Sequence, residues 1–410
     1  MIMLFRSAWV ALFFLFISLC SCHDNIQPDK EADTGLLKGD TAERTLVIYM
    51  MAENTLENFV EKDIDEIGIG ATSVPSDCRL FVYVDDCDLP RLIECYNKGG
   101  VGECRDLRLF TEDFCSSDTA ALKMILTDLL SDYPTRELDL VLWSHGDGWL
   151  SDNARVAPMR TIGIDNGRNV YSDKTTMAIE IDELAALLEG LPVRVNRLLL
   201  DACFMQGVEV AYALRNAVEW VVASPAEIPA EGAPYNAIVG AFFTSDGVEE
   251  ILESYLSAYL NSGMGIVLSA AYMPAMQKLA DATYANVCTY FNYEKKRDYT
   301  GVFAYLPGDV QNSFKGAVPH YYDVNSVMKR YLTDTEYSAW RNVLDEAVPY
   351  ARTTGSWWSD CIKKRCTVDV DVYSGISIYM PQHLSRNASL NIDFANTEWY
   401  QAAGWKEAGW

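Results

Sequence analysis

Short β-rich apolar runs alternate with segments of helical periodicity along the chain, and this alternation restricts the fold more than any other feature. The β-rich runs lie at residues 45–50, 79–85, 138–144, 197–200 and 220–224. The segments with helical periodicity lie at residues 56–67, 119–130, 181–188 and 205–216. Strands that alternate with helices in this way form a mainly parallel sheet, because each helix crosses back over a face of the sheet. The sequence therefore predicts an α/β fold with helices on both faces.

The second half of the chain continues this pattern less regularly. Residues 301–307 and 374–381 are two more strand candidates, and helical patterns occur at residues 273–290 and 335–351. A chain of 410 residues with 50% apolar content can bury at least one large core. We find no internal repeat and no low-complexity segment.

The N-terminal segment differs from the rest of the chain. Its apolar run at residues 8–19 is shorter than the roughly 20 residues needed to span a bilayer and is typical of a signal peptide. The run leads into a Leu-Cys-Ser-Cys motif that ends at Cys22 and resembles a bacterial lipobox, which implies cleavage before Cys22 and acylation of its thiol. We therefore expect a lipoprotein signal peptide at residues 1–21 and a flexible tether at residues 22–43. The expected location is the outer membrane or the cell surface.

The charge balance excludes some partners. Lys and Arg total 33 against 58 Asp and Glu, which gives a net charge of -25. Such a surface repels nucleic acid and anionic lipid, so we expect no nucleic-acid partner and a membrane contact only through the lipid anchor. It favours cationic ligands such as basic peptides, although the same charge also keeps an exported protein soluble.

The cysteines suit an exported protein but match no zinc pattern, because no Cys-x-x-Cys pair occurs. Cys87, Cys95 and Cys104 form one cluster of candidate disulfide partners, and Cys361 and Cys366 form a second across a short loop. The sequence does not settle the connectivity, and an anaerobic habitat would leave these residues as thiols.

Two of the predicted strands end in residues that carry chemistry. The run at 138–144 leads into His145, and the run at 197–200 leads into Asp201 and Cys203. In open α/β sheets, ligands bind outside the carboxyl ends of the strands. Three further histidines lie elsewhere: one in the expected tether and two that do not end a strongly apolar strand, namely His23, His320 and His383.

A cysteine and a histidine at such positions can form a catalytic pair. A thiol attacks an amide only as a thiolate, and a helix that starts directly after Cys203 would lower its pKa. His145 would act as the base, and the N–H of Gly146 could hold the oxyanion. The alternative is that Cys203 is a small buried apolar residue and His145 a hydrogen-bonded polar one.

Five segments resemble the clostripain family of cysteine peptidases, relatives of the caspases, legumains and gingipains. Residues 143–149, Trp-Ser-His-Gly-Asp-Gly-Trp, resemble the histidine motif, and residues 200–209, which contain Asp-Ala-Cys, resemble the nucleophile motif. Residues 46–56, 222–235 and 375–381 are similar to the first strand, to the block after the nucleophile and to a late strand. The resemblance spans most of residues 44–410.

The resemblance implies a caspase-like three-layer αβα sandwich with a mainly parallel six-stranded core sheet. Residues 44–240 would be the catalytic core with both motifs, and residues 241–410 would complete the sheet. The implied activity is that of a cysteine endopeptidase that cleaves after Arg or Lys, with Cys203 as nucleophile and His145 as base.

The resemblance also implies a specificity pocket with Asp201 at its floor, where a carboxylate pairs with guanidinium or ammonium. The alternative for Asp201 is a helix N-cap. Glu227 or Glu231 would add a second carboxylate to the pocket, or would be a solvated loop charge. We expect Glu209 to be structural.

Family members often cut themselves between the two motifs, where this chain offers Arg155 and Arg160 in a loop rich in turn residues. No cofactor is required by this chemistry. Calcium dependence occurs in part of the family, but no EF-hand pattern supports it here, and we assign no metal ligand.

The sequence also allows two rival functions. One is a non-catalytic surface lipoprotein that uses the caspase-like fold for binding. The other is a carboxylate-based hydrolase built on the acidic cluster Asp85, Asp86 and Asp88.

Overall fold

The computed structural model of the chain describes residues 36–149, 162–166, 177–260, 262–291, 299, 301–306, 321–381 and 388–410. The lipidation candidate, the two candidate cleavage sites and three of the four histidines lie outside these residues, namely Cys22, Arg155, Arg160, His23, His320 and His383. No helix within the described residues is long and apolar enough to cross a membrane.

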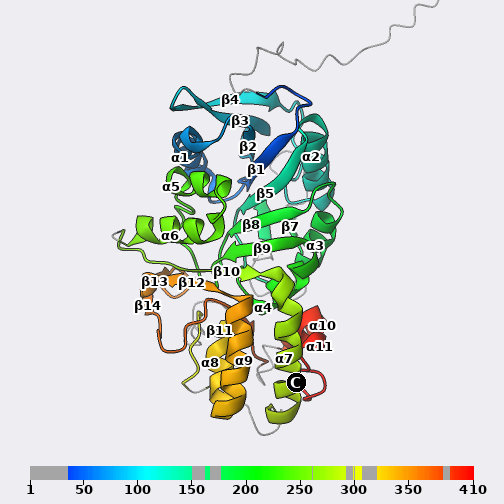
Figure 1. The fold of residues 1–410 in the computed structure, drawn as a ribbon, viewed down its shortest axis with the longest axis vertical. Coiled ribbons are helices and arrows are strands. Elements are labelled where there is room, and N and C mark those ends of the chain that lie inside the picture. The colour runs from blue at the N-terminus through cyan, green and yellow to red at the C-terminus, as the bar shows by residue number, and fades with distance from the viewer. Residues whose placement is uncertain are drawn as a thin grey trace, which may run out of the picture. The chain divides into compact units, whose positions relative to one another are not determined.

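A large mixed sheet forms the centre of the fold (Figure 1). Its five central strands are parallel and lie in the order β9-β8-β5-β1-β2. They are β1 (Ala42–Met51), β2 (Cys78–Asp85), β5 (Thr135–Trp143), β8 (Val195–Asp201) and β9 (Val218–Ala223). The prediction of a mainly parallel sheet in a caspase-like fold is confirmed.

Antiparallel strands extend this sheet at both edges. Next to β2 lie β3 (Arg91–Lys98) and β4 (Val101–Leu109), and next to β9 lie β10 (Val267–Tyr272) and β12 (Tyr350–Thr353). Within the described part of the chain the sheet therefore has nine strands, more than the six that were expected. Antiparallel edge strands need only short connections, so they can be added without a crossover helix.

Alternate side chains of the buried strands pack on opposite faces of the sheet. In β1, Val47, Tyr49 and Met51 belong to one apolar core, and the residues between them, such as Ile48, belong to the other. This alternation is the two-residue period of an extended strand. Because both faces are covered, the central strands are apolar throughout.

Helices cover both faces, as Figure 1 shows. On one face lie α1 (Val60–Gly70), α5 (Tyr235–Ile238) and α6 (Gly247–Tyr259). The other face carries α2 (Thr119–Asp132), α3 (Ile181–Glu189), α4 (Val208–Ala213) and α7 (Met276–Tyr290). The remaining helices are α8 (Val324–Tyr331), α9 (Asp334–Ala347), α10 (Ala388–Asn396) and α11 (Glu398–Ala402).

Within the described residues, three two-stranded sheets lie outside the main sheet. They pair β6 (Ile162–Asp165) with β7 (Met177–Ile179), β11 (Tyr321–Asp323) with β15 (Ser377–Tyr379), and β13 (Ser356–Ser359) with β14 (Lys364–Thr367).

Two expected strands differ from the structure. Residues 301–306 form only an isolated bridge, between Ala304 and Tyr322. The strand expected at 374–381 is the short β15, which pairs with β11 and not with the main sheet, whose edge beside β10 is taken by β12.

The first strand also begins earlier than expected. β1 starts at Ala42, inside the segment expected to be tether. The guanidinium of Arg79 donates to the carbonyl oxygens of Leu37, at 2.7 Å, and Asp40, at 3.1 Å. The chain is therefore held against the sheet several residues before residue 44.

Candidate active site

A cavity of about 320 Å³ opens at the carboxyl ends of β5 and β8. The two strands are neighbours, and Trp143 at the end of β5 lies opposite Asp201 at the end of β8. His145 follows the first strand and Cys203 follows the second, and both side chains line this cavity. The other sequence-predicted residues that line it are Asp201, Gly146 and Glu227.

His145 is held by a residue that the sequence did not single out. Its Nε2 lies 2.8 Å from the hydroxyl oxygen of Thr55, in the turn after β1. Its carbonyl oxygen accepts a hydrogen bond of 3.0 Å from the N–H of Gly163. Burial lowers the pKa of the imidazole, so the neutral form, the one that can accept a proton, predominates at pH 7.

The loop of His145 is tied to two neighbouring segments by Ser144. The hydroxyl of Ser144 donates to the carbonyl oxygen of Met51 at 2.9 Å and accepts from the N–H of Ile164 at 3.0 Å. These contacts join the end of β5 to the end of β1 and to β6. The candidate base therefore sits on a backbone held from both sides.

Cys203 lies in a tight turn between β8 and α4. Phe204 has a φ of 60°, a left-handed conformation that is uncommon for a residue with a side chain, and its ring stacks on Tyr321 at 4.8 Å. The thiol accepts a hydrogen bond from the N–H of Ile228, with a sulfur–nitrogen distance of 3.4 Å. This turn directs the sulfur into the cavity.

The expectation that a helix end favours the thiolate is wrong. α4 begins only at Val208, with Gly207 as its N-cap, and has six residues. Burial, rather than a cation, dominates the surroundings of Cys203 and raises its pKa to about 12. In this structure the sulfur is therefore a thiol at pH 7.

Gly146 is the point where the two loops meet. A Cβ atom there would lie 2.8 Å from the Cβ of Ala202 and 3.0 Å from the carbonyl oxygen of Cys203. Both distances are too short for a side chain, so the loop of His145 can approach the loop of Cys203 only with glycine at this position.

Asp201 is buried at the end of β8, with 3% of its surface exposed. Its Oδ2 accepts hydrogen bonds from the N–H of Ala233, at 3.0 Å, and the hydroxyl of Tyr235, at 2.9 Å, and its Oδ1 lies 3.5 Å from the hydroxyl of Tyr255. Burial raises the pKa of Asp201 to about 6. The alternative that Asp201 caps a helix is wrong, because Gly207 occupies that position.

Glu227 connects the cavity to the β13–β14 hairpin, which is distant in the sequence. Its Oε1 accepts from the N–H groups of Asp360 and Cys361, both at 3.0 Å, and its Oε2 accepts from the hydroxyl of Ser359. It is buried, so it is not a solvated loop charge, and both of its oxygens are occupied by the hairpin. Glu231 is exposed and does not line the cavity.

Two other acidic residues, Glu209 and Asp85, are buried and do not line the cavity. Glu209 is buried and accepts from the N–H of Tyr379 at 2.8 Å. Asp85 is fully buried, and burial, followed by the charge of Asp165, raises its pKa to about 9. A carboxyl group closed off from solvent cannot serve the carboxylate-based hydrolase that was considered for Asp85, Asp86 and Asp88.

One of the two cysteine groups is bonded. Cys95 and Cys104 form a disulfide between β3 and β4. Cys361 and Cys366 are free thiols, so the second candidate pair is wrong. Cys361 instead lies in the turn of the β13–β14 hairpin and lines the cavity, whereas Cys366 is buried opposite Trp357.

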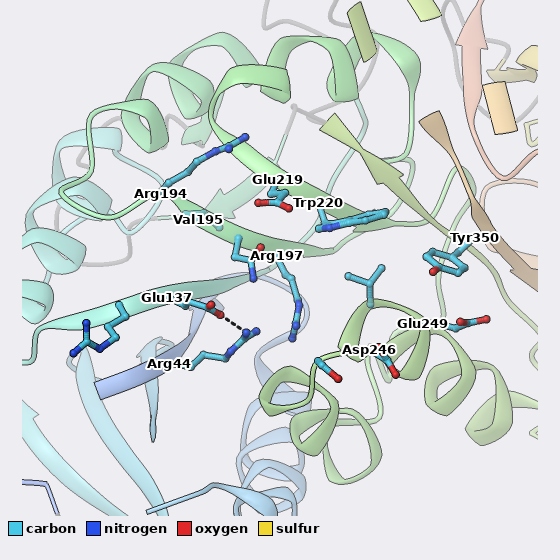
Figure 2. A pocket seen from close by; sticks show the side chains of 14 residues that line it. Arg44, Glu137, Arg194, Val195, Arg197, Glu219, Trp220, Asp246, Glu249 and Tyr350 are labelled. Atoms are coloured by element: carbon cyan, nitrogen blue, oxygen red, sulfur yellow. Dashed lines mark hydrogen bonds and ion pairs between the residues drawn. The ribbon is translucent and has the colours of Figure 1, made fainter. Parts of the chain in front are cut away.

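A second cavity, of about 530 Å³, lies at the opposite, amino-terminal ends of the parallel strands (Figure 2). Arg44 donates to Glu137 and, at 3.0 Å, to Asp139. The guanidinium of Arg197 lies 3.7 Å from Asp139. Burial raises the pKa of Asp139 to about 6, and the two arginines act in the opposite direction. The buried carboxylate of Asp139 is therefore flanked by two arginines that line this cavity.

The model of the clostripain family, Peptidase_C11, matches residues 48–410. The chain belongs to the clostripain family. Membership makes it a cysteine peptidase, a hydrolase that acts on peptide substrates, and does not favour the non-catalytic alternative. No curated protein sequence matches the chain.

Solved structures of clostripain-family proteases are similar to the chain over most of its length. A secreted C11 cysteine protease from Bacteroides thetaiotaomicron, in complex with an irreversible peptide inhibitor, is 26% identical, with a TM-score of 0.75 over 89% of this chain and 99% of that chain. An inactive zymogen C11 protease from Parabacteroides distasonis is 25% identical, with a TM-score of 0.73 over 90% and 99%. A B. fragilis cysteine protease is 29% identical over 58% and 99%, with a TM-score of 0.51.

Proposed function

We propose that this clostripain-family peptidase is an exported endopeptidase that cleaves after Arg or Lys, with Cys203 as nucleophile and His145 as base. The observation that carries the proposal is the meeting of Cys203, His145 and the buried carboxylate of Asp201 in one cavity. A thiol, a neutral imidazole and an acidic pocket are the groups that such a reaction requires.

The surroundings of the pair suggest how the thiolate forms. Because burial favours the neutral thiol, Cys203 gives its proton to His145 as it attacks. Thr55 holds Nε2 of the imidazole, which leaves Nδ1 to exchange the proton. A bond forms between the sulfur and the carbonyl carbon, and the N–H of Gly146 is a candidate donor to the oxyanion.

The second half of the reaction returns the proton. The imidazolium of His145 protonates the leaving amine as the C–N bond breaks, and a thioester remains on Cys203. Water, deprotonated by the neutral imidazole, then hydrolyses the thioester and releases the acid product and the thiol. Every proton is exchanged with His145 or water, so we propose that no cofactor is required.

Asp201 supports the choice of a basic side chain before the scissile bond. Its carboxylate lines the cavity two residues before the nucleophile and is not paired with a lysine or arginine among the described residues. A guanidinium or ammonium would supply the missing positive charge.

Export, lipidation and processing complete the proposal. The similar protease from B. thetaiotaomicron is secreted, and that from P. distasonis is a zymogen. For this chain we propose export with acylation at Cys22 and self-cleavage after Arg155 or Arg160. Alkyne fatty-acid labelling that marks the parent and misses Cys22→Ala would support the anchor, and N-terminal sequencing of the mature protein would identify a cleavage.

The central test is a scan of fluorogenic peptides that differ in the residue before the scissile bond. We expect turnover with Arg or Lys at that position, and none with Cys203→Ala, whose fold and melting temperature should be unchanged. Retained turnover in Cys203→Ala would reject the nucleophile, and a preference for Asp, Leu or Asn would reject the basic pocket.

A further inference from the structure

A second buried carboxylate lies directly behind the wall of the active-site cavity. Trp143 lines the cavity and donates its indole N–H to Oδ2 of Asp63, on α1, at 3.0 Å. Asp63 is fully buried, and its Oδ1 has no hydrogen-bond partner among the described residues. A buried carboxylate oxygen without a partner is costly, so anchoring one tryptophan does not by itself account for this residue.

Gly232 brings this pair of residues close to Asp201. A Cβ atom at Gly232 would lie 2.9 Å from Oδ2 of Asp201 and 3.4 Å from Nε1 of Trp143. Its φ of 64° also favours glycine. One end of the cavity is therefore bounded by Asp201 and by the indole that contacts Asp63. The ammonium of Lys62, next in sequence, is itself paired with Glu66 at 2.9 Å.

We propose that Asp63 is a second specificity determinant, which acts through the wall formed by Trp143 and raises the affinity of the cavity for a cationic side chain. The inference rests on the proposed function, because it requires an Arg or Lys side chain to enter beside Asp201. Asp63 does not line the cavity, so it is a positioning residue: its negative charge acts across the indole, without contact with the substrate.

The binding of a cation should then be linked to proton release. Burial, and next the charge of Asp201, raises the pKa of Asp63 to about 8, so the carboxyl group is mostly protonated at pH 7 in the empty cavity. A guanidinium beside Asp201 favours the ionised form, and Asp63 passes its proton to the solvent. The other titratable groups that face Asp63 are Lys62 and Glu66 on its own helix, Tyr235 on α5, and Tyr255 and Tyr259 on α6.

Binding of peptides to the inactive Cys203→Ala variant, measured by isothermal titration calorimetry, tests this inference. The probes are a short peptide with Arg at the cleavage position and the same peptide with citrulline, which keeps the shape of the side chain and removes its charge. Asp63→Asn keeps an oxygen that can accept from Trp143, and Asp65→Asn removes an exposed charge from the same helix as a matched control. Titrations in buffers of different ionisation enthalpy count the protons released.

We expect Asp63→Asn to weaken binding of the Arg peptide roughly three- to tenfold, to leave citrulline binding unchanged and to reduce the proton release. Asp65→Asn should resemble the parent. Unchanged Arg affinity and proton release in Asp63→Asn would overturn the inference, and so would an equal loss for both peptides, which indicates a displaced Trp143.

A different result would reject the proposed function. A parent protein that binds Arg and citrulline equally well would reject the basic pocket itself. Should Asp63→Asn not fold, Asp201→Asn in the same background decides: proton release linked to Arg should persist in part, because Asp63 remains, and its complete loss would overturn the inference.

Discussion

The buried carboxylates at the two ends of the parallel sheet differ in whether they are paired with a positively charged side chain. At the amino-terminal ends, the buried Asp139 lies between two arginines, Arg44 and Arg197. At the carboxyl ends, Asp201 and Asp63 are equally buried, but neither is paired with a lysine or arginine in the described part of the chain. Both ends carry a cavity, and they differ in whether the buried carboxylate beside it is paired with an arginine.

We expect this difference in charge pairing to divide the residues that matter for stability from those that matter for catalysis. A buried charge with its partner in place is part of the folded scaffold, and removing one partner leaves the other uncompensated. A buried carboxylate without a cation makes the empty protein less stable and is compensated when a cationic ligand arrives. Changes at the amino-terminal ends should therefore affect unfolding, and changes at the carboxyl ends should affect catalysis.

Among variants that keep the nucleophile, the largest effect on catalysis is expected at His145. His145→Ala removes the proposed base and should lower kcat/KM on an Arg peptide by roughly 10²–10⁴-fold, the usual range for a general base. The melting temperature should change little, because within the described residues the ring makes one side-chain hydrogen bond, to Thr55. Steady-state kinetics together with thermal melting checks this, and an activity within a few-fold of wild type would show that another group is the base.

The largest effect on stability is expected at the opposite end. Arg197→Ala leaves Asp139 with one arginine instead of two and should lower the free energy of unfolding by about 3–5 kcal/mol. Arg136→Ala, which removes an exposed arginine paired with Glu43, is the matched control and should cost about 1 kcal/mol or less. Denaturant unfolding measures both, and kcat/KM per folded molecule should be unchanged.

A second variant sharpens the interpretation of Arg197→Ala. If the loss comes from the uncompensated carboxylate, adding Asp139→Ala should restore part of the stability. No recovery would assign the loss to the hydrogen bonds from Arg197 to the carbonyl oxygens of Phe242 and Thr244 instead.

A smaller effect is expected for Asp201→Asn, which keeps the shape of the side chain and removes the charge. A charge-assisted hydrogen bond contributes about 1.5–3 kcal/mol, so kcat/KM on Arg and Lys peptides should fall at least about tenfold. The effect of Asp201→Asn on the melting temperature should be much smaller than its effect on kcat/KM. A variant that loses stability and keeps its preference for Arg would break the contrast between the two ends of the sheet.

The smallest effect is expected in the pH dependence of stability. Asp63 keeps its proton up to about pH 8 in the folded protein but loses it near pH 4 when unfolded, so the folded state binds more protons between these values. The free energy of unfolding should therefore fall as the pH rises through this window, and Asp63→Asn should lack this contribution. At pH 9 we expect the variant to exceed wild type by on the order of 1–3 kcal/mol in denaturant unfolding.

The sign of this trend is the critical observation. An advantage of Asp63→Asn that stays constant from pH 5 to pH 9 would mean that Asp63 is already ionised in the empty folded protein over this range. The two ends of the sheet would then not differ in the way described.

Local sequence patterns were sufficient for the central strands and for the two loops of the cavity. The runs before His145 and Cys203 are apolar because both faces of β5 and β8 are covered, and the polar residues begin where these strands end. Thr55 and Asp63 were missed because each reaches the site from a segment at least 80 residues away, and a hydroxyl or a carboxylate in a helix or turn has no distinctive local pattern.

The error at Cys203 has a different cause. Residues 205–216 have helical periodicity, but the chain first turns at Phe204, and the helix begins only after Gly207. Periodicity indicates which side chains face the core and does not reveal where hydrogen bonding within the helix starts. The pKa of a strand-end cysteine depends on that start, so it could not be judged from the pattern.

The contact between Glu227 and the β13–β14 hairpin has a consequence for the order in which the enzyme is made. Its partner Ser359 lies 132 residues further along the chain. A polypeptide that is synthesised from its N-terminus therefore has the loops of Cys203 and His145 before this wall of the cavity exists. The cavity is complete only once the β13–β14 hairpin has been made and has packed against Glu227.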